Sequence, residues 1–184
     1  MTSPDRAALV FVGPMGAGKS SIGRKVAREL GVAFTDTDTM IVREHGPIPA
    51  LFAAKGEEHF RSLERSAVVA ALAAGGVVAL GGGAVLDPHT RADLAHHRVV
   101  LLTVAPEIVK ARIGGANRPL LSGGDAVARW EQIYAERRSL YDEVADITFD
   151  SSVGHVSAVA AAIARWAREN DVTTDSRPTP EASA

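Results

Sequence analysis

The chain has 184 residues, of which 46% are hydrophobic and 23% charged, a composition typical of one compact domain and not of a disordered chain. Its 20 basic and 22 acidic residues leave a formal net charge of −2, so no overall positive field favours nucleic acid or an anionic membrane. The absence of cysteine excludes disulfides, thiolate metal sites and cysteine nucleophiles. We therefore expect a cytoplasmic protein without a nucleic-acid or membrane partner. A monomer is a separate expectation that does not follow from these numbers.

One uncharged segment, residues 67–86, meets the length criterion for a membrane span. Five of its twenty residues are glycines, and the pair Gly75-Gly76 is typical of a helix end followed by a buried strand. We therefore predict that this segment belongs to the core. The short apolar run at 7–12 is followed by no cleavage site of the kind that ends a secretory signal.

Five apolar runs predict the strands of the fold. They mostly lack the polar alternation of a half-exposed strand, and helical stretches separate them, so they indicate a parallel sheet buried on both faces. In chain order the expected strands cover residues 7–12, 32–35, 77–80, 99–104 and 147–149. The predicted fold is a three-layer α/β domain.

Helices are expected in the intervals between these strands. The first carries Ile22, Val26 and Leu30 on one face and ends at Gly31, where a left-handed residue costs little. The others are expected between Asp38 and about Gly75, with interruptions near 46–49 and at Gly56, then at 105–113, at 125–144 and from Val156 to Trp166.

Two segments are expected to lie outside this regular structure. Residues 114–124 contain four glycines, two at each end, which is typical of a mobile lid with glycine hinges. The polar segment 171–184 predicts a disordered tail. Residues 1–170 are therefore expected to form a single domain with a lid at about 114–124.

The strongest motif is Gly13-x4-Gly18-Lys19-Ser20, which follows the first strand and opens the first helix. Backbone N–H groups of such a loop wrap nucleotide phosphates, the lysine reaches the β and γ phosphates, and the hydroxyl binds Mg²⁺. The helix N-terminus adds its dipole to this anion site. The composition of the chain gives about 0.004 chance matches to the pattern, so the motif predicts nucleotide binding.

Further polar residues follow the other strands, at the sheet edge where ligands collect in open α/β folds. Asp36 and Asp38 are two positions apart, so in extended geometry their side chains point the same way. One could hold Mg²⁺ through water and the other orient or deprotonate an acceptor hydroxyl; alternatively, one only caps the next helix. The triplet Gly81-Gly82-Gly83 would let a ligand approach backbone N–H groups.

Several arginines suggest an anionic small substrate, because guanidinium groups bind carboxylates in bidentate fashion. Arg61 precedes Arg65 by one helical turn, and Arg137 and Arg138 are adjacent on a later helix. Arg118 lies in the expected lid, where it could close over the transferring phosphoryl group. A solvated helix or loop surface is the commoner fate of any single arginine.

Together these residues resemble the shikimate kinase family over about residues 7–167. The resemblance rests on five motifs: Gly-Pro-Met-Gly-Ala-Gly-Lys-Ser at 13–20, Asp-Thr-Asp at 36–38, Gly-Glu-Glu-His-Phe-Arg-Ser-Leu-Glu at 56–64, Gly-Gly-Gly-Ala at 81–84 and Asn-Arg-Pro-Leu-Leu at 117–121. It implies a P-loop NTPase fold of the nucleoside monophosphate kinase type, with a parallel five-stranded sheet and helices on both faces. It also implies Mg²⁺-dependent transfer of the ATP γ-phosphoryl group to the shikimate 3-hydroxyl.

The resemblance assigns a role to each matching residue, and it implies that Glu64 orients Arg61. Catalytic roles fall to Lys19, Asp38 and Arg118; ATP binding to Gly16, Ala17, Gly18, Lys19, Ser20, Ser21, Arg112 and Arg118; shikimate binding to Asp38, Arg61, Gly81, Gly82, Gly83 and Arg137; and Mg²⁺ binding to Ser20 and, through water, Asp36.

The chain departs from the family pattern at one substrate motif. The family commonly has Arg-x-Pro-Leu-Tyr, whereas this chain has Arg137-Arg138-Ser139-Leu140-Tyr141. Arg138 therefore competes for the carboxylate role, although the spacing to Tyr141 favours Arg137. Residues 151–156, where the family contacts adenine, give no assignable site.

Two alternatives to shikimate phosphorylation are kept. One is gluconate kinase or another metabolite or nucleotide kinase of the same fold, against which the glycine triplet and the sequence around Arg61 argue. The other is a nucleotide-binding regulatory protein without catalysis. Against it argue the intact residues of the expected site, which are Lys19, Ser20, Asp36, Asp38 and Arg118.

Overall fold

The computed structural model describes residues 8–113 and 125–172 of the chain. Its centre is a sheet of five parallel strands in the order β2-β3-β1-β4-β5. The strands are β1 Leu9–Val12, β2 Phe34–Asp36, β3 Val77–Ala79, β4 Arg98–Thr103 and β5 Ile147–Asp150. All five expected strands are therefore present, and the parallel sheet is confirmed.

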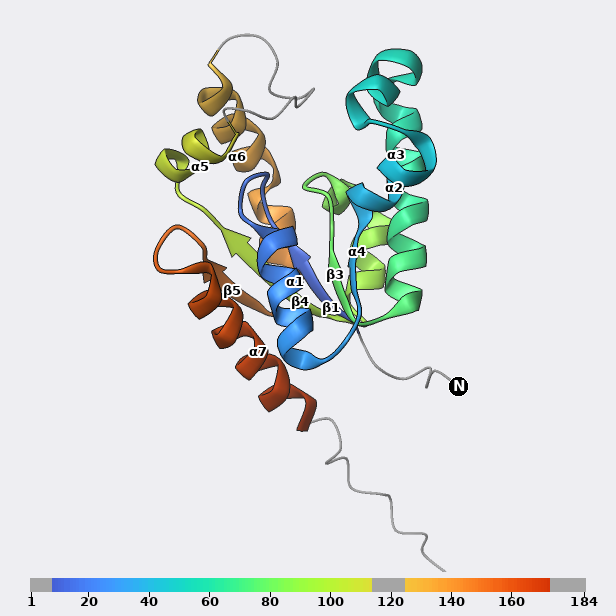
Figure 1. The fold of residues 1–184 in the computed structure, drawn as a ribbon. Helices are drawn as coiled ribbons and strands as arrows, with labels where there is room; N and C mark the ends of the chain where they lie inside the picture. Colours follow the sequence, from blue (N-terminus) through green and yellow to red (C-terminus); the bar gives the residue numbers. More distant parts are fainter. Residues whose placement is uncertain (1–7, 114–124, 173–184) are drawn as a thin grey trace, which may run out of the picture.

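Helices cover both faces of the sheet, as Figure 1 shows, with α1 and α7 in front and α3, α4 and α6 behind. The helices are α1 Lys19–Leu30, α2 Thr37–His45, α3 Ile48–Ala74, α4 Pro88–Leu94, α5 Pro106–Ile113, α6 Ala126–Val144 and α7 Val156–Val172, with a 3₁₀ turn, η1, at Ala84–Leu86. The three-layer α/β architecture is confirmed.

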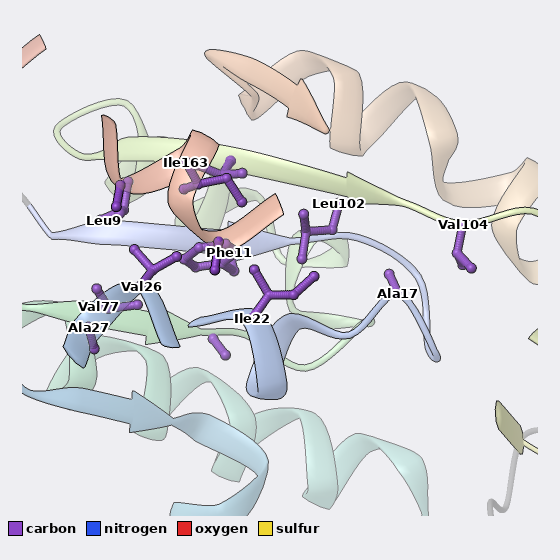
Figure 2. Packing of buried hydrophobic residues seen from close by; sticks show 14 of the residues in the cluster. Leu9, Phe11, Ala17, Ile22, Val26, Ala27, Val77, Leu102, Val104 and Ile163 are labelled. Atoms are coloured by element: carbon purple, nitrogen blue, oxygen red, sulfur yellow. The ribbon is translucent and has the colours of Figure 1, made fainter. Parts of the chain in front are cut away.

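Alternate residues of the central strands supply two separate cores. Leu9 and Phe11 of β1 pack with Ile22 and Val26 of α1 and Ile163 of α7 on one face, as Figure 2 shows. Their neighbours Val10 and Val12 pack on the opposite face with buried residues of α3, α4 and α6. Because both faces of each strand are buried, the strands read as continuous apolar runs in the sequence.

Glycines end or interrupt helices where the sequence predicted. Gly31 follows α1 with φ of 68° and is a left-handed cap. Gly56 lies inside α3 with φ of 80° and ψ of 174°, so the helix kinks there. Within the described residues, no helix combines the length and apolarity needed to cross a membrane; residues 67–86 form the end of α3, β3 and η1.

Two short elements, η1 and α4, were missed by sequence analysis. The signal for α4 was present: the Asp87 side chain accepts bonds from the backbone N–H groups of His89 and Thr90, and Pro88 occupies the first turn. At the other end of the chain, α7 extends to Val172, past the expected start of the tail at 171. The expected lid at 114–124 and the remaining tail lie outside the described residues.

Candidate active site

A cavity of about 710 Å³ opens at the carboxyl ends of the strands, between the phosphate loop, α3 and α6. This is the sheet edge where the fold class predicts ligands. Thirteen of the residues predicted from the sequence line it: Gly16, Gly18, Lys19, Ser20, Ser21, Asp36, Asp38, Arg61, Gly81, Gly82, Gly83, Arg112 and Arg137. Ala17 instead packs its methyl group in the core, and Arg118 lies outside the described residues.

The loop between β1 and α1 needs its glycines for two reasons. Gly13, Gly16 and Gly18 all have positive φ, which side chains rarely adopt. At Gly13 a Cβ would also lie 2.2 Å from the Leu102 carbonyl oxygen. The Lys19 ammonium donates to the carbonyls of Gly13 and Pro14, at 2.7 and 3.0 Å, so its charge lies along the loop at the start of α1.

Asp36 joins the end of β2 to this loop. Its Oδ2 accepts a 2.5 Å bond from the Ser20 hydroxyl, and its Oδ1 accepts from the Thr39 N–H at 3.0 Å. Asp36 is thus the N-cap of α2, the alternative left open for this pair of aspartates. The extended geometry expected from Asp36 to Asp38 is wrong, because α2 begins at Thr37 and places Asp38 in its first turn.

The Ser20 hydroxyl and the Asp36 carboxylate bring together the oxygen donors that Mg²⁺ prefers. Both side chains are at the cavity wall beside Lys19, at the N-terminus of α1. The chemistry of these two residues therefore fits a Mg²⁺ ion.

The glycines after β3 are not required by backbone conformation, since none of the three has a positive φ, but two of them leave space for side chains. A Cβ at Gly81 would lie 2.6 Å from Asp38 Oδ1 and 2.7 Å from Glu64 Oε1. At Gly83 it would lie 2.1 Å from Arg61 Nη1. Gly81 and Gly83 therefore make room for three charged side chains, whereas a Cβ at Gly82 would have its nearest neighbours at an ordinary 3.6 Å. The Gly81 N–H is used within the protein, because it donates to the buried Thr37 hydroxyl at 3.1 Å.

Arg61 is held by two carboxylates on its own helix. Its Nη1 lies 2.6 Å from Glu64 Oε2, and its Nη2 lies 3.0 Å from Glu57 Oε1. Burial raises the pKa of Glu64, and the nearby Asp38 carboxylate adds to this rise, against the lowering effect of Arg61. Arg65, one turn later, pairs with Asp93 of α4 at 2.6 Å and does not line the cavity. The two arginines thus diverge.

Arg137 and Arg138 are also separated by the fold. Arg137 is buried and donates from Nη1 to the Gly82 carbonyl at 3.2 Å. The Tyr141 hydroxyl, one turn later, donates to the same carbonyl at 2.6 Å. Arg138 has a side chain that is 66% exposed and faces Asp142 at 3.7 Å. The structure therefore places Arg137 at the cavity and Arg138 outside it.

Arg112 and Trp130 reach the phosphate loop from α5 and α6. Arg112 Nη1 donates to the Gly16 carbonyl at 3.0 Å, and its Nη2 donates to the Ser151 carbonyl at 3.0 Å. The indole N–H of Trp130 donates to the Met15 carbonyl at 2.8 Å. Sequence analysis missed Trp130, Thr37 and the Glu57 contact, since no local pattern marks a side chain whose partner lies on another element.

The cavity has two chemically different sides. The loop side carries Lys19 and Arg112 beside backbone N–H groups, as a phosphate chain requires. The other side combines Asp38, Arg61 and Arg137 with an apolar wall of Ile48, Pro49, Phe52 and Phe60. Such a mixture suits a small carboxylate that also carries hydroxyl groups.

Comparison with known proteins agrees with this geometry. Residues 15–168 match the shikimate kinase family. The chain belongs to the shikimate kinase family. It is 44% identical to a shikimate kinase of Mycobacterium avium over 153 residues, which are 82% of this chain and 87% of the relative.

Solved structures support the same assignment. The structure of an Acinetobacter baumannii shikimate kinase in complex with shikimate superposes with a TM-score of 0.84 at 32% identity, covering 92% of this chain and 97% of that one. A gluconokinase from Sinorhizobium meliloti superposes with a TM-score of 0.61 at 18% identity, covering 95% and 100% of the two chains, and shares the fold alone. The family and the fold class inferred from the sequence are confirmed.

Proposed function

We propose that the chain transfers the γ-phosphoryl group of ATP to the 3-hydroxyl group of shikimate. The observation that carries this proposal is that one cavity joins a phosphate loop to a pocket with Asp38, Arg61 and Arg137. Shikimate has one carboxylate and several hydroxyl groups, which match the two arginines and the aspartate of that pocket. Family membership supports the same reaction.

On the nucleotide side, the loop N–H groups and Lys19 bind the phosphates of ATP, and Gly16, Gly18 and Ser21 line this part of the cavity. Ser20 would hold Mg²⁺ directly and Asp36 through water. A Mg²⁺ ion held there would supply positive charge that offsets the negative charge of the phosphate chain. Lys19 complements it by holding the developing negative charge at the leaving phosphate oxygen.

On the acceptor side, Arg61 and Arg137 bind the shikimate carboxylate, while Asp38 accepts a hydrogen bond from the attacking hydroxyl. As the new oxygen–phosphorus bond forms and the bond to ADP breaks, Asp38 takes the hydroxyl proton. The transition state is loose, so alignment and charge neutralisation matter more than a strong base. Arg118, in the expected lid, is proposed to close over the transferring group.

Arg112 is proposed to border the adenine side of the nucleotide, as the family pattern implies. In the structure its guanidinium donates to the carbonyls of Gly16 and Ser151, so it lies beside the phosphate loop. Monomeric state and cytoplasmic location also stay predictions.

The experiment measures ADP release with Mg²⁺ and ATP, with shikimate, gluconate or a nucleoside monophosphate as acceptor. Stimulation by shikimate alone is the expected result. Stimulation by another acceptor only would retain a kinase and contradict the pocket assignment, and stimulation by none would favour a regulatory protein that binds nucleotide without catalysis.

Two matched pairs of variants test the pocket. Arg61→Ala and Arg137→Ala should each raise KM for shikimate about tenfold or more, because each removes a charge-assisted contact, and should change KM for ATP little. Arg65→Ala and Arg138→Ala, at neighbouring positions outside the cavity, are the controls. Equal effects within a pair would contradict the assignment of the carboxylate site.

A further inference from the structure

Four successive carbonyl groups of the phosphate loop each accept a hydrogen bond from a side chain. Lys19 donates to Gly13 and Pro14 at 2.7 and 3.0 Å. The next two carbonyls accept from other elements: Met15 from Trp130 of α6 at 2.8 Å, and Gly16 from Arg112 of α5 at 3.0 Å. The loop is therefore held from outside as well as by its own lysine.

The bond from Trp130 has a consequence for the other side of the same peptide. In a trans peptide the C=O and the following N–H point in opposite directions, and the described residues contain no cis peptide bond. A donor that fixes the Met15 carbonyl on the α6 side therefore fixes the Gly16 N–H toward the opposite side. Gly16 lies in the part of the loop whose N–H groups wrap phosphates.

Trp130 is a rigid donor. Its side chain is only 2% exposed and packs within the core that also holds Ala17 and Ile22 of the loop and α1. Its ring lies 5.3 Å from that of Tyr134, one turn later on α6. A buried indole has few alternative orientations, so its N–H stays aimed at the loop without an entropic cost at the moment of binding.

We propose that Trp130 is a positioning residue for the nucleotide phosphates: its indole N–H holds the Met15–Gly16 peptide in the orientation that presents the Gly16 N–H to the phosphate chain. This inference rests on the proposed use of ATP. The same helix carries Arg137 on the acceptor side. The helix α6 thus contacts the phosphate loop through Trp130 and the loop after β3 through Arg137; Figure 1 shows the course of this helix in orange.

The test compares Trp130→Phe with Trp166→Phe. The chain has two tryptophans, and Trp166 packs against the same core from α7 without lining the cavity. Binding of Mg·ATP and of inorganic tripolyphosphate is measured by calorimetry, and KM for shikimate by ADP release. Tripolyphosphate lacks the nucleoside, so it reports on the loop alone.

The expected result is that Trp130→Phe weakens both ligands by a similar factor, about tenfold, as for loss of one buried hydrogen bond. KM for shikimate should change less than about twofold, because the indole N–H bonds to the phosphate loop and not to Arg61 or Arg137. Trp166→Phe should bind both ligands like the wild type. Equal affinity of the wild type and Trp130→Phe for both ligands would overturn the proposal, as would a loss confined to ATP, which would place Trp130 at the nucleoside.

A second variant separates the effect of the indole N–H on ligand binding from the effect of side-chain packing. Replacing Trp130 by 3-benzothienylalanine keeps the shape of the side chain and removes only the donor. Weakened tripolyphosphate binding in this variant supports the proposal, and wild-type binding overturns it. If the wild type binds neither ATP nor tripolyphosphate, the proposed function fails and this inference fails with it. If the wild type binds both ligands and the Trp130 variants bind them equally tightly, the inference alone fails.

Discussion

Ionisation of Tyr141 should lower the free energy of unfolding at alkaline pH. The substitution Tyr141→Phe should abolish this part of the pH dependence. The side chain is 2% exposed, and its hydroxyl donates to the Gly82 carbonyl at 2.6 Å. Burial raises the pKa of this tyrosine from its ordinary value of 10.0 to about 12, although the nearby Arg137 charge opposes the shift. The folded protein therefore keeps a proton that the unfolded chain releases.

The sign and size of the effect follow from this difference in pKa. Between the ordinary value of 10.0 and about 12, the unfolded state binds fewer protons than the native state, so the free energy of unfolding falls as pH rises. One unit corresponds to about 1.4 kcal/mol. The contribution of Tyr141 is thus fully present below pH 10, is reduced by about 1 kcal/mol at pH 11, and is reduced by about 3 kcal/mol well above pH 12.

Urea unfolding of the wild type and of Tyr141→Phe, at pH 8 and pH 11, measures the effect. At pH 8 the variant should be about 1 kcal/mol less stable, because it lacks the bond to Gly82. At pH 11 this deficit should disappear or reverse, since phenylalanine does not ionise while other alkaline titrations are common to both proteins. A stability difference that does not change with pH would refute the reasoning.

A spectroscopic titration checks the same quantity independently. The chain has two tyrosines, and Tyr134→Phe leaves Tyr141 as the one that titrates. The ultraviolet absorbance of tyrosinate in this variant should rise with a pKa well above 10. Ionisation near 10 in the folded protein would contradict the burial argument, whatever the unfolding data show.

Two further predictions concern the cavity. In Gly83→Ala the new Cβ would lie 2.1 Å from Arg61 Nη1, so the guanidinium must move; KM for shikimate should rise about tenfold or more with little change in KM for ATP, and steady-state kinetics showing equal changes would contradict the placement of Arg61. Asp36→Asn keeps a good helix N-cap and removes the charge beside Ser20, so the Mg²⁺ concentration for half-maximal activity should rise on the order of tenfold. An unchanged Mg²⁺ titration, with circular dichroism like that of the wild type, would argue against a role of Asp36 at the ion.

Much of the architecture could be predicted because it depends on local patterns. The strands are buried on both faces, so their apolar runs are continuous. Gly31 ends α1 and Gly56 kinks α3, because both positions have a positive φ that glycine adopts readily. The helix α4 was missed although Asp87 and Pro88 mark its start, since that pattern is short and carries no apolar period of its own.

The glycine triplet shows where a correct prediction rested on an incomplete reason. Sequence analysis expected Gly81 to Gly83 at the ligand pocket, with backbone N–H groups open to a ligand. The structure places them there, but the Gly81 N–H is used by Thr37, and the missing side chains at Gly81 and Gly83 leave space for Asp38, Glu64 and Arg61. Which side chains needed that space depends on how α2 and α3 pack over β3.

By itself, the sequence determined the phosphate loop, the parallel sheet and the family, because each rests on short local patterns that can be recognised one segment at a time. The family pattern and the spacing to Tyr141 already favoured Arg61 and Arg137 over Arg65 and Arg138, and only the tertiary structure supplies the physical reason. Arg65 turns away because α4 brings Asp93 to it. The contact between Trp130 and Met15 joins residues 115 positions apart; such a pair is set by the packing of whole elements, which no local pattern records.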